Sequence, residues 1–205
     1  MNRDRFQIRP YAPKDFHAVY EVCLQTGDAG SDATPLHTDP MALGNLYVGP
    51  YLTLEPDLAF VLEDDRGVCG YVLGALDSMS FFDACLRDWM PELRRQHPDP
   101  AGDPADWSPT QQVYHEFHHP DLFWPEPYDQ FPSHLHIDLI PRAQGQGCGS
   151  ELMRVELSAL TRRGSPGVHL GMAVSNQRAE QFYRKLGFRE LTRVKDSLYL
   201  GKPLL

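Results

Sequence analysis

The chain has 205 residues, of which 41 % are hydrophobic and 23 % are charged. These proportions exclude a fully disordered chain and are typical of one globular domain. The 19 Lys and Arg residues against 28 Asp and Glu residues give a formal net charge of −9, so neither nucleic acid nor an anionic membrane is expected as a partner.

The first part of the chain predicts short strands and two helices. Apolar alternation indicates strands, and Pro13 is typical of the first turn of a helix. The turn residues Asp64-Asp65-Arg66-Gly67 between two apolar runs indicate a β-hairpin. The expected elements are a strand over 6–9, a helix over 13–25, a loop over 27–40, a short helix over 41–51, and strands over 58–63 and 68–76.

Residues 77–132 differ from the rest of the chain in being rich in proline, histidine and aromatic residues. They predict helices over 81–95 and 110–118, with a loop over 99–109 between them. Since the first half of this segment is too polar to have a core of its own, we interpret the segment as a long insertion or lid within a single domain of residues 1–205.

The last third of the chain alternates strands with helices. An order of strand, helix, strand and helix requires at least one parallel βαβ unit, and the hairpins elsewhere make the sheet mixed. The expected fold class is therefore α/β, with a mixed, twisted central β-sheet flanked by helices. The predicted elements are strands over 134–140 and 168–174, helices over 149–163 and 176–186, and a terminal hairpin that ends near Gly201.

A glycine-rich segment, Gln144-Gly145-Gln146-Gly147-Cys148-Gly149, lies between a predicted strand and a predicted helix. Its alternating glycines let the backbone curl closely around a ligand and leave several amides pointing into one concavity at a helix N-terminus. Such a turn suits a pyrophosphate and needs no basic surface, which agrees with the acidic net charge. An ordinary flexible turn is the alternative.

The helix predicted over 176–186 carries four apolar or aromatic residues on one face. Ala179, Phe182, Tyr183 and Leu186 have the i, i+3, i+4, i+7 spacing of such a face. Taken alone, this face is better interpreted as ordinary core, with Tyr183 as a packed aromatic residue.

Together the two segments resemble the GNAT family of acetyl-CoA-dependent N-acetyltransferases. Gln144-x-x-Gly147-x-Gly149 resembles the family's Q/R-x-x-G-x-G/A pattern, and residues 176–188 resemble its N-x-x-A-x-x-F-Y-x-K-x-G-F pattern. Residues 8–11, 48–51, 68–71 and 131–133 further resemble the acetyltransferase-like C-terminal domain of O-GlcNAcase and its free-standing bacterial relatives. That domain lacks the glycine-rich turn, so the turn favours acetyl-CoA binding here.

The resemblance implies a GNAT fold, acetyl-CoA as co-substrate, and direct transfer of the acetyl group to a primary amine without a covalent enzyme intermediate. It implies a cleft between two splayed strands in which backbone groups at Leu139 and Ile140 pair with pantetheine. Asn176 is expected to bond the same arm, and Tyr183 is expected to be the general acid that protonates the departing sulfur. The implied cofactor-binding residues are Leu139, Ile140, Gln144, Gly145, Gln146, Gly147, Cys148, Gly149, Ser150, Asn176, Ala179, Phe182 and Tyr183.

A general base must remove a proton from the acceptor ammonium before attack. His134, His136 and Asp138 share one face of a strand beside the expected cleft, because side chains alternate with a period of two. Asp138 and His136 are therefore the candidate catalytic base, and Glu116 is a weaker candidate. A merely solvated strand face is the alternative.

The segment His115-Glu116-Phe117-His118-His119 suggests a metal site, because residues 115 and 119 align on a helix as in H-E-x-x-H. Pro120 ends that helix at once, however, and no third ligand is evident. No metal is therefore expected, and a contact with the acceptor or the wall of its pocket is the favoured interpretation.

The four cysteines are widely scattered, no stretch has the length of a transmembrane helix, and the N-terminus lacks the apolar core of a signal peptide. These features predict a cytoplasmic protein with reduced thiols. The acceptor amine is open among a peptide lysine, an amino sugar and a polyamine, and a homodimer is possible. The alternative function is a pseudo-acetyltransferase, a sensor that binds acetyl-CoA without turnover.

Overall fold

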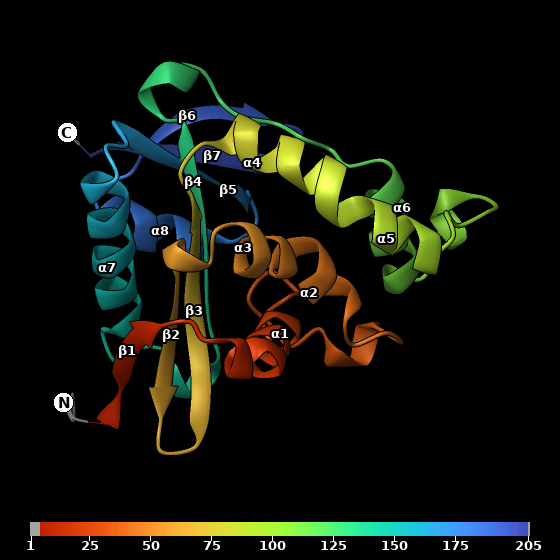
Figure 1. Cartoon of the computed structure of the whole chain (residues 1–205), viewed down its shortest axis with the longest axis horizontal. Coiled ribbons are helices and arrows are strands. Elements are labelled where there is room, and N and C mark those ends of the chain that lie inside the picture. The colour runs from red at the N-terminus through yellow and green to blue at the C-terminus, as the bar shows by residue number, and fades with distance from the viewer. Residues whose placement is uncertain (1–4, 205) are drawn as a thin grey trace.

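The computed structural model describes residues 5–204 and contains one sheet in the order β1-β2-β3-β4-β5-β7-β6 (Figure 1). Neighbouring strands are antiparallel except for β4 and β5, which are parallel. The predicted mixed α/β sheet and its parallel unit are thus confirmed. The strands are β1 (Gln7–Pro10), β2 (Ala59–Asp64), β3 (Gly67–Ala75), β4 (Ser133–Leu139), β5 (Gly167–Ala173), β6 (Arg189–Val194) and β7 (Ser197–Pro203).

Helices cover both faces of the sheet, with α7 and α8 on one side and α1, α2 and α3 on the other (Figure 1). None of the helices in residues 5–204 is long and apolar enough to cross a membrane. The helices are α1 (Phe16–Leu24), α2 (Ala42–Tyr47), α3 (Gly49–Leu54), α4 (Ser78–Ala84), α5 (Met90–Gln96), α6 (Pro109–His118), α7 (Cys148–Arg162) and α8 (Gln177–Lys185).

Two predicted helices differ from the structure at a proline. The single helix predicted over 41–51 is divided into α2 and α3 at Val48, where the backbone leaves the helical conformation (φ −125°, ψ −54°), and Pro50 has no amide to bond the preceding turn. The helix predicted from Pro13 begins as a short 3₁₀ turn and becomes α1 only at Phe16.

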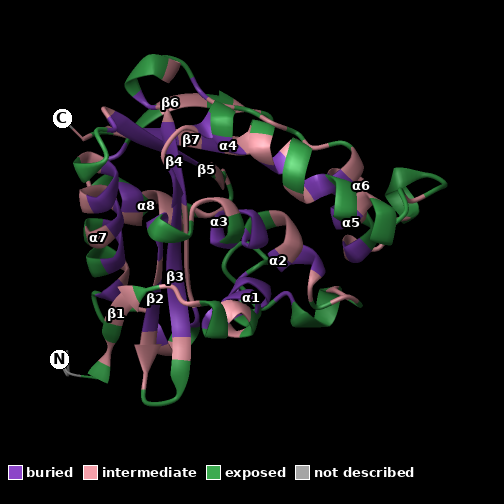
Figure 2. Cartoon of the chain, in the orientation of Figure 1, coloured by how far each residue is buried: buried purple, intermediate pink, exposed green. Residues whose placement is uncertain are grey.

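The segment 77–132 forms α4, α5 and α6, which extend to one side of the sheet (Figure 1). A π-helical stretch, Cys85–Trp89, joins α4 to α5. Phe81, Met90 and Phe117 are buried in the same hydrophobic core as the sheet, whereas the loop between α5 and α6 is mostly exposed (Figure 2). The helices of the insertion therefore add to the main core.

β4 and β5 separate soon after they begin. They pair only at Ser133 with Val168 and at His134 with His169. Beyond this point β4 continues along β3, and β5 continues along β7. The divergence that the family resemblance implies is therefore present, and it leaves one edge of β4 unpaired beside β5.

Candidate functional site

The glycine-rich turn connects the end of β4 to the start of α7. Gly145 and Gly147 adopt φ values of 72° and 82°, a left-handed conformation that favours glycine. A Cβ atom built on either residue would have no neighbour within 4 Å, so the space around both is open. Gly147 caps α7, which begins at Cys148, one residue before the predicted start. The first amides of a 15-residue helix therefore adjoin open space into which an anion can approach.

The end of β4 corrects one expectation. The amide of Ile140 donates to the carbonyl of Cys69 at 3.1 Å, and the Ile140 carbonyl accepts from Ala143 at 3.0 Å. The expectation that Ile140 offers unpaired backbone groups is wrong, because the residue still belongs to the ladder with β3. Alternate residues of an antiparallel strand point away from that ladder, so the amide of Leu139 is the one that faces β5.

The carbonyl of Leu139 already has a partner, since the Gln144 side chain donates to it at 2.6 Å. This bond ties the first residue of the glycine-rich turn to the end of β4. Gly149 approaches both α8 and the end of β4, because a Cβ built on it would lie 3.3 Å from Phe182 Cζ and 3.7 Å from Leu139 Cδ1. The structure thus brings the two predicted motifs into contact.

Asn176 is the N-cap of α8. Its Oδ1 accepts from the amide of Ala179 at 3.0 Å, and its Nδ2 donates to the carbonyl of Ala29 at 3.2 Å. Both polar atoms of the side chain therefore stabilise the chain itself, which is the usual use of an asparagine at the start of a helix.

Tyr183 lies on the inner face of α8 and is 9 % exposed. Its ring packs edge-on against Phe182 and Phe188, with centroid distances of 5.2 and 5.7 Å. Burial, with a further contribution from the charge of Asp138, raises the pKa of Tyr183 well above its ordinary value of 10. The phenol therefore keeps its proton at neutral pH, as a general acid must.

Asp138 and His136 form a bonded pair on β4. His136 Nε2 lies 2.7 Å from Asp138 Oδ2, and the Tyr71 hydroxyl donates to the same oxygen at 2.6 Å. The His136 ring stacks on Tyr71 and on Tyr47, at 5.7 and 6.3 Å between centroids. When Nε2 carries the proton shared with Asp138, Nδ1 has a lone pair that can accept one.

Burial and the neighbouring Asp138 have opposite effects on the pKa of His136. Burial lowers the pKa of His136, but the charge of Asp138 and its hydrogen bond together outweigh burial, so the pKa is raised above 6.5. This arrangement increases the basicity of the imidazole and holds its orientation.

His134 does not join this pair. Its Nδ1 lies 2.7 Å from the Ser78 hydroxyl, and its Nε2 lies 2.8 Å from the Tyr51 hydroxyl. Burial, with the nearby His169 and His136, lowers the pKa of His134 to about 3. A neutral imidazole with both nitrogens bonded is structural, so His134 shares the strand face of His136 and Asp138 without an available nitrogen.

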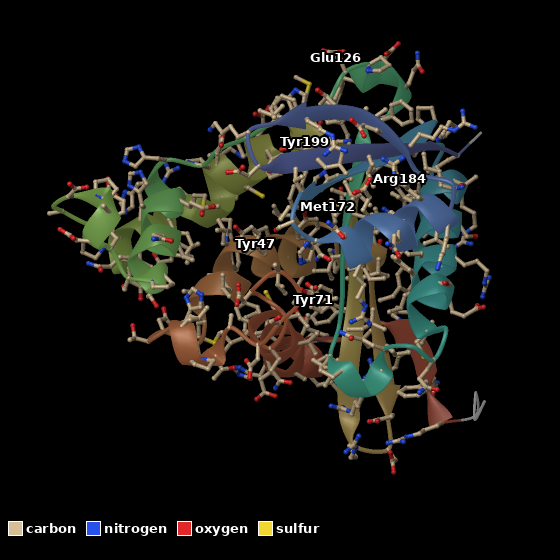
Figure 3. All side chains as sticks on the ribbon, turned by 180° about the vertical axis from the view of Figure 1, so that it is seen from behind. Tyr47, Tyr71, Glu126, Met172, Arg184 and Tyr199 are labelled. Carbon is tan, nitrogen blue, oxygen red and sulfur yellow. The ribbon has the colours of Figure 1, made fainter. Side chains whose placement is uncertain are left out.

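A cavity of about 440 Å³ opens beside His136. Tyr47 from α2, Met172 from β5 and Tyr199 from β7 line it (Figure 3). The insertion supplies the remaining wall, in which Glu116 accepts a long hydrogen bond of 3.4 Å from the Tyr47 hydroxyl. Burial raises the pKa of Glu116.

The acidic groups that line this cavity are partly compensated, since Lys195 donates to Asp121 Oδ2 at 3.1 Å. The cavity lining contains the carboxylates of Glu116 and Asp121 and, among the residues described by the structure, no lysine or arginine.

Cys148, in the glycine-rich turn, is buried, and burial raises the pKa of its thiol. It is therefore poorly suited to act as a nucleophile.

A family model described as an acetyltransferase (GNAT) domain matches residues 123–190. The solved structure of SsHAT is 38 % identical, with a TM-score of 0.90 over 98 % of this chain and 99 % of that chain. Protein O-GlcNAcase from Rattus norvegicus is 33 % identical over 97 % of this chain and 22 % of its own length. The chain thus spans about a fifth of that curated relative.

More distant structures share the fold. The yncA structure from Salmonella typhimurium, which contains its cofactor acetyl-CoA, is 16 % identical with a TM-score of 0.56 over 98 % of this chain and 95 % of that chain. The chain belongs to the GNAT acetyltransferase family. The predicted resemblance to O-GlcNAcase is likewise confirmed by the identity with that protein.

Proposed function

We propose that the chain binds acetyl-CoA and transfers its acetyl group to a primary amine by direct attack. The observation that carries this proposal is the divergence of β4 from β5 directly beside the turn of Gly145 and Gly147. An unpaired strand edge can pair with an extended pantetheine arm, and the turn amides can bind its pyrophosphate. The yncA structure with acetyl-CoA supports the same substrate for this chain.

Each part of the site has a proposed role in binding. The amides of residues 145–150 hold the pyrophosphate, and the Leu139 amide bonds the pantetheine arm. Phe182 and Ala179 pack beside the turn. Both polar atoms of the Asn176 side chain already bond within the chain, so Asn176 can bond the pantetheine arm only when one of these two hydrogen bonds is broken.

The proposed reaction begins with the acceptor amine. His136 Nδ1 takes a proton from the ammonium, and Asp138 stabilises the resulting imidazolium. The amine then attacks the thioester carbonyl, the carbon–sulfur bond breaks, and Tyr183 delivers its proton to the departing sulfur. The nitrogen loses its remaining extra proton to solvent to give the neutral amide, and Tyr183 regains a proton from solvent. No enzyme nucleophile takes part, since attack by the amine is direct.

The cavity beside His136 is the proposed acceptor site. A cationic amine suits it, because its described lining residues include the carboxyl groups of Glu116 and Asp121 and no lysine or arginine, although Asp121 is already paired with Lys195 outside the lining. We also propose that residues 1–205 act as one domain in which the insertion 77–132 is the wall of this site.

Acetyl-CoA is expected to stabilise the folded chain. A ligand that binds only the native state at a hundredfold excess over its Kd adds about 2.7 kcal/mol, which corresponds to roughly 5–10 °C in Tm for a chain of this size. Differential scanning fluorimetry with acetyl-CoA tests this, with acetyl-pantetheine, which lacks the pyrophosphate, giving a smaller shift. A melting curve that millimolar acetyl-CoA leaves unchanged would contradict the proposed function.

Gly147→Val is expected to abolish acetyl-CoA binding. A branched side chain would fill the open space at the turn, and the left-handed conformation would cost about 1–2 kcal/mol. Gly67→Val is the matched control, since Gly67 also has a positive φ (103°) and open surroundings but lies in the β2–β3 turn. Calorimetric titration should show binding to the control alone, and equal affinities for the two variants would disprove the role of the turn.

Asp138→Asn is expected to shift the pH dependence of acetyl transfer. His136 acts when neutral, so kcat/KM should rise with pH through its raised pKa. Loss of the carboxylate charge lowers that pKa, and the rise should move to lower pH with a reduced plateau. The profile is measured with an amine that the wild type acetylates. A midpoint that stays unchanged in the variant would exclude the pair as the base.

A further inference from the structure

Three side chains of metal-binding type meet in the insertion, outside the proposed reaction site. Asp99 lies in the loop between α5 and α6, and His115 and His119 lie at the end of α6. Asp99 Oδ1 is 2.8 Å from His115 Nδ1, and Asp99 Oδ2 is 2.7 Å from His119 Nε2. All three ligand atoms lie within 4.8 Å of one another. The carboxylate is the third ligand that the sequence did not reveal.

The local structure holds this convergence in place. The i, i+4 spacing puts His115 and His119 on one face of the helix end, with ring centroids 4.3 Å apart. Trp107 packs on His115 at 4.7 Å. His118 points elsewhere, since its Nε2 lies 2.8 Å from the carbonyl of His97. The adjacent His118 and His119 therefore have different partners, and only His119 contacts Asp99.

The donor set suits zinc. Two imidazole nitrogens and one carboxylate oxygen with an open fourth position are a common arrangement of protein ligands for Zn²⁺. Bonds of about 2.0–2.2 Å in a tetrahedron separate the ligand atoms by about 3.3 Å. That spacing lies between the 2.7–2.8 Å of the present hydrogen bonds and the 4.8 Å within which the three ligand atoms meet.

We propose that Asp99, His115 and His119 bind one zinc ion, with the fourth position open to solvent. The side chains of the three residues are 38 %, 37 % and 57 % exposed, so an ion can enter without unfolding. The bound ion would join the exposed α5–α6 loop to α6, the helix that carries Glu116 into the cavity wall. This proposal is independent of acetyl transfer.

Isothermal titration of ZnCl₂ into the tag-free, EDTA-treated full chain tests the site. One ion per chain is expected. His119→Ala and Asp99→Asn should each weaken binding more than about tenfold, since even partners that only orient metal ligands contribute 10–100-fold. His118→Ala is the matched control, because it removes the neighbouring imidazole from the same helix end without removing a ligand, and it should bind as the wild type does.

Two further measurements distinguish a specific zinc site from the effects of misfolded variants and from nonspecific metal binding. Circular dichroism should show equal helicity of all four proteins without zinc. Co²⁺ in place of zinc should give the strong visible absorption of a tetrahedral site in the wild type and His118→Ala, but not in Asp99→Asn. A wild type that binds no zinc, or a His118→Ala variant as impaired as His119→Ala, would show that Asp99 and the two histidines form only a hydrogen-bonded cluster.

Discussion

Replacing Glu156 with methionine is expected to stabilise the protein increasingly as the pH rises. Glu156 lies on α7, is 0 % exposed, and has no hydrogen-bond partner for either carboxylate oxygen within residues 5–204. Its carboxylate occupies the space that Gly74 leaves on β3, where an added Cβ would overlap Oε1. An uncompensated buried carboxylate strongly disfavours its charged form.

The sign of the pH effect follows from the direction of the shift. Burial raises the pKa of Glu156 from 4.5 to about 8, an effect that Arg163 reduces and Glu55 adds to. The folded state therefore binds a proton that the unfolded chain has lost, and stability falls between pH 4.5 and 8. That difference in pKa corresponds to roughly 5 kcal/mol. Below pH 4.5 the penalty for charge is absent.

Urea unfolding at pH 5, 7 and 9 measures the effect. The free energy of unfolding of Glu156→Met should exceed that of the wild type most at pH 9, because methionine is unbranched, apolar and of similar length. Glu156→Gln is the control, because it removes the titrating group but keeps a buried polar group. Its free energy of unfolding should change with pH as that of Glu156→Met does, but should be lower at every pH. Parallel pH profiles for wild type and Glu156→Met would contradict the prediction.

Local sequence patterns predicted the parts of the site that are formed by neighbouring residues. The alternating glycines at 145 and 147 predicted a turn in which the backbone can curl closely, and both residues have the positive φ that such a turn uses. The apolar spacing on the helix 176–186 placed Tyr183 on the inner face, where it is buried. A turn and a helix face depend on residues a few positions apart, so their sequence carries the information.

Contacts between distant residues could not be predicted in this way. Tyr71 reaches Asp138 only because β3 and β4 pair with those two residues opposite each other, and 67 positions separate them. The family resemblance included Tyr71 without indicating this bond. The same limit applies to Asp99, whose approach to His115 depends on how α5 and α6 pack.

The sequence pattern also could not predict which hydrogen-bond partners individual polar side chains have. His134 and His136 have equivalent positions in the alternation of β4, yet one is bonded by Ser78 and the other by Asp138. Which nitrogen remains available depends on neighbours contributed by other elements. Strand periodicity therefore placed the candidate base on a face of β4, but it could not distinguish a histidine with both nitrogens bonded from one with a nitrogen available.

Removal of one hydroxyl, as in Tyr183→Phe, is expected to slow acetyl transfer while leaving acetyl-CoA binding nearly unchanged. The phenylalanine ring preserves the packing against Phe182 and Phe188. If Tyr183 is the general acid, the chemical step should slow by about 10²–10⁴-fold. The low end of that range is expected, because a thiolate is a tolerable leaving group. The loss should appear in kcat rather than KM, since the proton is needed chiefly as sulfur departs.

The measurement is the pre-steady-state rate of thiol release with an amine that the wild type acetylates, combined with calorimetric titration of acetyl-CoA. Tyr20→Phe is the matched control, because it also removes a buried phenol, bonded to Asn45, away from the proposed site; it should retain the wild-type rate. If Tyr183→Phe transfers acetyl as fast as the wild type with chemistry rate-limiting, the tyrosine is structural and another group protonates the sulfur. If the wild type binds acetyl-CoA but releases thiol with no amine in a broad panel, the chain is an acetyl-CoA sensor, and the raised pKa of Tyr183 reflects only its burial.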